Sequence, residues 1–197
     1  MLIDRIIYPI HALGPGKRAV IWTVGCRKSC DNCSNPELRF FDSSKEMSLQ
    51  TFSKVIRRFE DTRPDGFTIT GGEPFCQPEE LYYYMQVMRK YADDILIFSG
   101  YSEPELTKLG RTDPFIDRCR SLASVLILGE YREEYNDNKT ALLASGNQEI
   151  IFVEERFREP YEAYMKAGRR IENVFYKNEL ISVGIHNKKE CEPDEGA

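Results

Sequence analysis

The chain has 197 residues, which is enough for one domain with a sizeable core, and its formal net charge is −5. This acidic balance provides no positive field to attract nucleic acid. No uninterrupted apolar stretch of about 18 residues occurs, so we expect no membrane-spanning helix. The N-terminal residues carry no basic leader followed by a long apolar region, so the six cysteines are not expected to form disulfides after export. We therefore expect a reduced, cytoplasmic protein.

Apolar strands and helical patterns alternate along most of the chain. After an extended lead-in over residues 2–8, buried strands are expected over 19–24, 67–70, 95–98, 125–128 and 150–153. Helices are predicted to begin near Ser48, Pro78, Ser102 and Asp113, and another is predicted over 157–166. Near-continuous apolar strands separated by helices indicate a parallel sheet covered on both faces. About five to six parallel strands in this length predict an open partial (β/α) barrel, because full closure typically takes about 250 residues.

The end of the chain has a different character. Two β-rich runs, 173–176 and 180–185, are joined by Lys177-Asn178-Glu179 and predict a C-terminal β-hairpin. The last ten residues are charged and contain proline and glycine, which is typical of a disordered tail. We therefore divide the chain into a partial barrel over 1–170, a hairpin appendage over 171–187 and a disordered tail over 188–197.

Three cysteines follow the first buried strand at C-x3-C-x2-C spacing: Cys26, Cys30 and Cys33. One short loop with this spacing can present three sulfurs to a metal, and thiolates select zinc, Cu(I) or iron–sulfur clusters. A structural zinc site and an ordinary ferredoxin cluster each need four protein ligands. No fourth cysteine or histidine follows nearby, because the next thiol is Cys76. Three thiolates on a four-iron cluster would leave one iron open for chemistry.

A second motif follows the next strand. Phe67 to Thr70 lead directly into Gly71-Gly72-Glu73-Pro74. Two glycines at the end of a strand allow a close approach of the backbone to a ligand, and the Glu73 carboxylate is an acceptor suited to an ammonium group.

The two motifs, in this order and each after a strand, resemble the radical S-adenosylmethionine (radical SAM) superfamily. Within it, the chain is similar to the activating enzymes of glycyl radical enzymes, particularly those of anaerobic ribonucleoside-triphosphate reductases. This nearer resemblance covers roughly residues 14–153. It rests on W-x-x-G-C-x-x-x-C-x-x-C-x-N-P-E, T-G-G-E-P-F-x-Q, S-G-Y, V-L-I-x-G-x-Y and S-x-N-Q.

The resemblance implies a [4Fe–4S] cluster held by the three cysteines, with S-adenosylmethionine on the open iron. The 5′-deoxyadenosyl radical formed by reductive cleavage would then abstract hydrogen from a glycine of a partner, an anaerobic ribonucleotide reductase. Flavodoxin or ferredoxin is the implied electron donor. No side-chain general base is expected. The implied cofactor-binding residues are Asn32, Cys33 and Ser34 near the adenine, Gly71, Gly72, Glu73 and Pro74 around the methionine amino group, and Ser99 and Asn147 near the ribose or carboxylate.

Several alternatives stay open. Ser99 and Asn147 are equally explained as caps of strand ends, and the charges of Arg27 and Lys28 either tune the cluster or are simply solvated. Leu128, which stands where the family usually has Asp, and the C-terminal hairpin leave room for modification of a peptide or a small molecule instead. A non-catalytic iron–sulfur or zinc module would need Cys76 or His11 as its fourth ligand.

Overall fold

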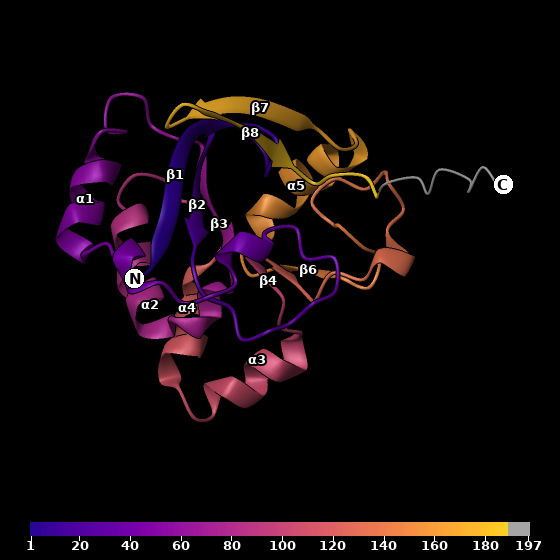
Figure 1. Ribbon diagram of the computed structural model, residues 1–197, viewed down its shortest axis with the longest axis horizontal. Coiled ribbons are helices and arrows are strands. Elements are labelled where there is room, and N and C mark those ends of the chain that lie inside the picture. The colour runs from indigo at the N-terminus through magenta and orange to yellow at the C-terminus, as the bar shows by residue number, and fades with distance from the viewer. Residues whose placement is uncertain (189–197) are drawn as a thin grey trace, which may run out of the picture.

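The computed structural model describes residues 1–188 and contains a six-stranded sheet with strands in the order β1-β2-β3-β4-β5-β6 (Figure 1). These strands are β1 (Ile3–Ile10), β2 (Arg18–Thr23), β3 (Gly66–Gly71), β4 (Ile95–Ser99), β5 (Val125–Leu128) and β6 (Glu149–Phe152). Strands β2 to β5 are parallel, as predicted. The extended lead-in forms β1, which pairs antiparallel with β2. The carboxyl ends of β2 to β5 therefore meet at one edge of the sheet.

The prediction that the strand over 150–153 is parallel is wrong, because β6 runs antiparallel to β5. A parallel return needs a crossover to the opposite edge of the sheet, usually through a helix. Within the described chain, the connection over 129–148 contains only one short 3-10 turn, Glu133–Tyr135. This connection stays at the carboxyl edge of β5, so the chain re-enters the sheet there and must run back.

One face of the sheet is covered by four helices: α1 (Leu49–Arg57), α2 (Pro78–Met88), α3 (Glu103–Gly110) and α4 (Pro114–Leu122). Their predicted starts are confirmed. Ser48 accepts a hydrogen bond from the amide of Thr51, and Ser102 and Glu105 form a capping box. The apolar sides of the helices contact alternate residues of the strands in the largest core cluster, which includes Phe52, Ile56, Met85, Ile116, Cys119, Ile21, Ile69 and Ile97. Cys119 is thus the core thiol expected.

The opposite face is covered by two further pieces. Helix α5 (Arg158–Lys166) packs through Tyr161 against β4 and β5. The hairpin of β7 (Ile171–Tyr176) and β8 (Glu179–Gly184) lies across β1 and β2, where Val183 packs in one cluster with Val20 and Trp22 (Figure 1). The turn is one residue shorter than expected, because only Lys177 and Asn178 lie between the strands, with φ of 47° and 69°. Positive φ at both positions matches the twist of a two-residue hairpin.

The predicted α/β class and the C-terminal hairpin are confirmed, and the sheet is mostly rather than wholly parallel. Closure of the sheet into a partial barrel stays a prediction, as does the division at residue 170. The disordered tail is predicted to begin at residue 188. Apart from Lys188 itself, this tail lies outside the residues that the structure describes. No helix within 1–188 is long and apolar enough to cross a membrane.

Candidate functional site

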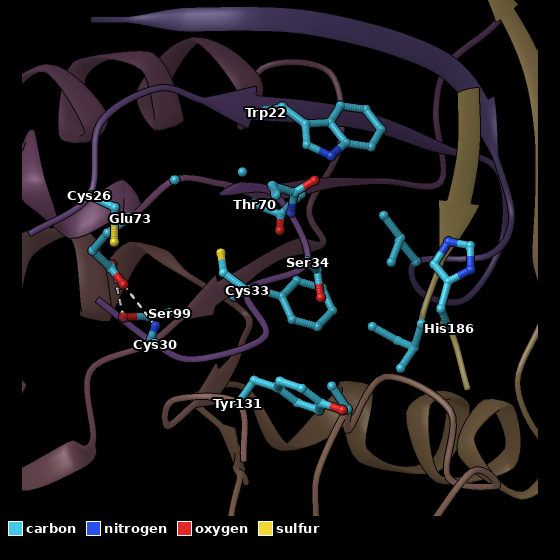
Figure 2. Close-up of a pocket in the computed structure, with 18 of the residues that line it drawn as sticks. Trp22, Cys26, Cys30, Cys33, Ser34, Thr70, Glu73, Ser99, Tyr131 and His186 are labelled. Carbon is cyan, nitrogen blue, oxygen red and sulfur yellow. Dashed lines mark hydrogen bonds between the residues drawn. The ribbon is translucent and has the colours of Figure 1, made fainter. Parts of the chain in front are cut away.

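A cavity lies at the carboxyl edge of the parallel strands, on the face that carries the hairpin (Figure 2). Both sequence motifs open into it. Its lining draws on five parts of the chain. It includes Cys26, Cys30, Cys33 and Ser34 from the loop after β2, Gly71, Gly72 and Glu73 at the end of β3, Ser99 and Gly100 at the end of β4, Gly129, Glu130, Tyr131, Leu142, Ala144 and Gln148 from the β5–β6 connection, and residues 181–186. This is the edge at which parallel α/β sheets usually bind ligands.

The cysteine loop is attached to its own downstream segment. The amide of Gly25 donates to the carbonyl of Leu38 at 2.8 Å, and the amide of Cys26 donates to the carbonyl of Arg39 at 2.9 Å. The Arg39 guanidinium in turn donates to the carbonyl of Cys30 at 2.9 Å. Cys26, Cys30 and Cys33 are free thiols of intermediate burial. The loop therefore brings three separate sulfurs to one cavity (Figure 2).

The two candidate fourth ligands do not belong to this lining. Cys76 does not line the cavity, and its Sγ lies 3.9 Å from the hydroxyl of Tyr101. His11 is also outside it, with Nδ1 at 2.9 Å from Oε1 of Glu172. Among residues 1–188, no three His, Cys, Asp or Glu side chains are grouped so as to hold a single metal ion. A four-iron cluster does not require its ligands to converge on one point, because each thiolate binds a different iron.

Two thiols of the loop, Cys26 and Cys30, are not activated by their surroundings. Burial raises the pKa of Cys26 to about 11, and burial also raises the pKa of Cys30. Both side chains are therefore protonated near neutral pH in the free protein. Because the thiolate is the metal ligand, metal binding must release these protons, and uptake of a cluster is expected to be favoured at higher pH.

The glycine turn is joined to the start of the cysteine loop through backbone contacts. The amide of Gly72 donates to the carbonyl of Thr23 at 2.8 Å, and the amide of Glu73 donates to the carbonyl of Gly25 at 2.9 Å. A Cβ on Gly72 would lie 2.5 Å from the oxygen of Gly25. Gly71, at φ 106°, would bring a Cβ to 2.5 Å from the backbone of Thr23. Glycine is thus required at both positions because two chain segments touch there, and a bound ligand would be a second reason for the absence of a side chain.

We expect Gly72→Ala to lower both the stability and the cluster content of the protein. The added methyl group would push the glycine turn away from Gly25, the residue that precedes Cys26. Iron analysis and thermal unfolding would measure the two effects. Gly146→Ala is the matched control, because its Cβ would meet nothing closer than the Tyr135 oxygen at 3.4 Å. Normal iron content in the Gly72→Ala protein would contradict this coupling.

Glu73 is held by the protein on both carboxylate oxygens. Its side chain is 1% exposed, with Oε1 accepting from the amide of Phe75 at 3.0 Å and from the hydroxyl of Ser99 at 2.9 Å. Oε2 accepts from the amide of Gly100 at 2.7 Å. Burial raises the pKa of Glu73 to about 7, although these hydrogen bonds act in the opposite direction. Three of roughly four acceptor positions of the carboxylate are therefore occupied, which leaves about one for a ligand.

Comparison with known proteins identifies this arrangement. The family model described as a 4Fe-4S single cluster domain matches residues 12–151. The chain belongs to this family. The matched part contains the three cysteines, the glycine turn and all four parallel strands, and it ends within β6.

Relatives named as activating proteins also match most of the chain. The anaerobic ribonucleoside-triphosphate reductase-activating protein of Vibrio cholerae is 28% identical over 152 residues, which is 73% of this chain and 93% of the relative. The protein of the same name from Enterobacteria phage T4 is 27% identical, over 76% of this chain and 93% of its own length. The pyruvate formate-lyase-activating enzyme of Clostridium pasteurianum is 32% identical over a shorter region, 39% of this chain and 34% of the relative. The expected resemblance to glycyl radical activating enzymes is confirmed.

The donor set of this 4Fe-4S family member fits its cofactor. Three free thiols line one cavity, and neither Cys76 nor His11 reaches it to complete a closed four-ligand site. Cys26, Cys30 and Cys33 would hold the cluster. Family membership and these relatives confirm the expected [4Fe–4S] cofactor, and they imply S-adenosylmethionine as its companion.

The other predicted site residues are distributed unevenly. Ser34 lines the cavity, and the hydroxyl of Ser99 faces Glu73 (Figure 2). Pro74 is buried at the start of a 3-10 turn behind the cavity wall. Asn32 and Asn147 do not line the cavity. The side-chain amide of Asn32 donates to the Glu133 carboxylate, and the side-chain amide of Asn147 donates to the carbonyl of Glu130. The structure thus places Ser99 beside the glycine turn, whereas cofactor contacts of Asn32, Pro74 and Asn147 stay predictions.

The sequence motifs did not single out Gln148 as a site residue, and they left the role of Lys28 open. Gln148 lines the cavity next to Asn147 and bridges the β5–β6 connection, accepting from the amide of Ala144 and donating to the carbonyl of Gly129. The S-x-N-Q motif contains Gln148, whereas the family resemblance points to its neighbour Asn147. Lys28 lies 5.0 Å over the ring of Tyr101 and forms an ion pair with Glu105, so it is a paired side chain that ties the cysteine loop to α3.

Proposed function

We propose that this protein generates a glycyl radical on an anaerobic ribonucleoside-triphosphate reductase by radical SAM chemistry. The observation that carries the proposal is the meeting of three cysteines and the glycine turn at one cavity, in a chain that spans 93% of an activating relative. When bound, the cluster supplies the electron that splits S-adenosylmethionine into methionine and the 5′-deoxyadenosyl radical, which removes a hydrogen atom from the glycine Cα.

The protein's own residues bind, orient and enclose these reactants. Cys26, Cys30 and Cys33 hold the cluster, and the free acceptor position of Glu73 receives the methionine amino group. The apolar side chains of Trp22 and Phe98 line the same cavity and keep water from the radical. We propose flavodoxin or ferredoxin as the electron donor and the cytoplasm as the place of action.

We expect the reduced, reconstituted protein to yield little 5′-deoxyadenosine from S-adenosylmethionine alone. Adding the anaerobic ribonucleoside-triphosphate reductase of the same organism should raise the yield and produce a doublet radical signal in electron spin resonance. The Cys30→Ala protein is the control and should give neither. If a peptide or a metabolite stimulates turnover and no glycyl radical enzyme does, the proposal is wrong, and modification of another substrate is the function.

A further inference from the structure

The C-terminal hairpin lies beyond the part matched by the family model, yet it is firmly attached to the fold. Its inner face packs through Val183 and Ile181 in a cluster with Trp22. The carboxylate of Glu172 on β7 accepts from the amides of His11 and Ala12 at 2.6 and 2.7 Å. The position of β8 relative to the sheet is therefore set by both apolar packing and hydrogen bonds.

Strand β8 presents its edge, rather than one of its faces, to the cavity. The last four residues of β8, Ile181 to Gly184, line the cavity without a gap, as do the two residues that follow the strand. Side chains of a strand alternate between its faces, so a face alone would contribute only every second residue. Figure 2 shows the end of this strand beside the cavity, with His186 following it and Ser34 and Cys33 across from it.

The hairpin register shows which backbone groups point away from β7. Tyr176 pairs with Glu179 across the two-residue turn, and Asn173 pairs with Ser182. In an antiparallel pair, hydrogen-bonded and non-hydrogen-bonded positions alternate, starting with a hydrogen-bonded pair at such a turn. The N–H and C=O groups of Leu180 and Ser182, together with the N–H of Gly184, therefore point to the free side. Within residues 1–188, β7 and β8 form a separate two-stranded sheet, and no third strand covers this side.

The surroundings of this edge favour an extended peptide as its occupant. Apolar side chains from several elements share the cavity with it, among them Leu13, Trp22, Phe98 and Leu142. Once a macromolecule closes such a cavity, backbone N–H and C=O groups without a partner become costly. An added strand supplies a matching row of donors and acceptors, as in other cases of β-strand addition. Neither a helix nor a small metabolite has such a row of free backbone groups.

We propose that the edge of β8 over Ser182 and Gly184 binds the glycine-bearing segment of the radical enzyme as a third strand. The proposal rests on the proposed function and specifies how its substrate is recognised. Added at this edge, the segment runs through the cavity that contains the three cysteines and the glycine turn. Glycine suits this place because its Cα has no side chain to keep it from the reacting carbon.

Proline substitutions on β8 test this proposal. Ser182→Pro removes one outward N–H group while leaving the bonds between β7 and β8, because this N–H does not point to β7. We expect it to weaken binding of the reductase, and of a synthetic peptide containing its radical glycine, by about tenfold or more. Iron content and S-adenosylmethionine binding should stay normal. Leu180→Pro is the matched control, because the N–H group of Leu180 also points outward but the residue does not line the cavity. Ser182→Ala is a second control, because it changes the side chain and retains the N–H group. Both should bind like the wild type.

Hydrogen exchange of the wild-type protein provides a test that needs no variant. Binding of the reductase should slow exchange at the amides of Ser182 and Gly184 but not at Leu180. Unchanged exchange at Ser182 and Gly184 in the complex, or wild-type affinity in a folded Ser182→Pro protein, would overturn the β8 assignment. The proposed function fails separately, if the wild-type protein forms no radical on the reductase.

Discussion

Cys30→Ala is expected to abolish the iron–sulfur cluster, whereas Cys76→Ala should leave it largely intact. Cys30 lines the cavity together with Cys26 and Cys33, and Cys76 does not. Reconstituted wild-type protein should contain about four irons per chain. Loss of one of three protein thiolates would leave two of the four irons without a protein ligand, and this should not support a stable cluster. Iron and sulfide analysis after anaerobic reconstitution measures the result.

Cys76→Ala is a stringent control for this expectation. Cys76 is two residues beyond Pro74 of the glycine turn, and its Sγ lies 3.9 Å from the Tyr101 hydroxyl. It therefore tests whether a nearby thiol of similar burial completes the site. If Cys76→Ala removed the iron as fully as Cys30→Ala, the cluster would have four protein ligands and no open iron. A closed module without S-adenosylmethionine chemistry would then be favoured.

Arg18→Met is expected to destabilise the protein by about 3–5 kcal/mol, the cost of leaving a buried partner charge uncompensated. Arg18, at the start of β2, is fully buried. Its guanidinium donates to Oδ2 of Asp94 at 2.6 Å and to Oγ1 of Thr68 at 2.6 Å. The hydroxyl of Tyr161 donates to the same Asp94 carboxylate at 3.0 Å. The network thus connects three neighbouring strands with α5.

Chemical unfolding of the cluster-free protein would measure this loss. Arg156→Met is the control, because the Arg156 side chain is 56% exposed and forms ion pairs at the surface, with Glu154 at 2.8 Å and with Asp93 at 3.6 Å. Exposed pairs of this kind contribute little to stability. Equal free energies of unfolding for Arg18→Met and the wild type would show that the buried network is energetically neutral.

The chemistry of the site could be predicted from the sequence because it depends on local spacing. Cys26, Cys30 and Cys33 lie within one short loop, and the Gly71-Gly72-Glu73 turn directly follows a recognisable apolar strand. Helix starts such as Ser48 were predictable for the same reason, since a capping side chain acts within about three residues of itself. The hairpin was likewise predictable from its turn and the β-rich runs beside it.

Other properties depended on contacts between distant segments. The reversed direction of β6 follows from the path of the 129–148 connection, and the apolar pattern of a buried strand is the same in either direction. Ser99 faces Glu73 only because β3 and β4 end at the same edge of the sheet. The exposed β8 edge became part of the cavity because the hairpin packs on β1 and β2. Local motifs, with the family resemblance that they carry, therefore indicated which chemistry the protein performs, whereas tertiary packing decided which side chains and backbone groups surround that chemistry.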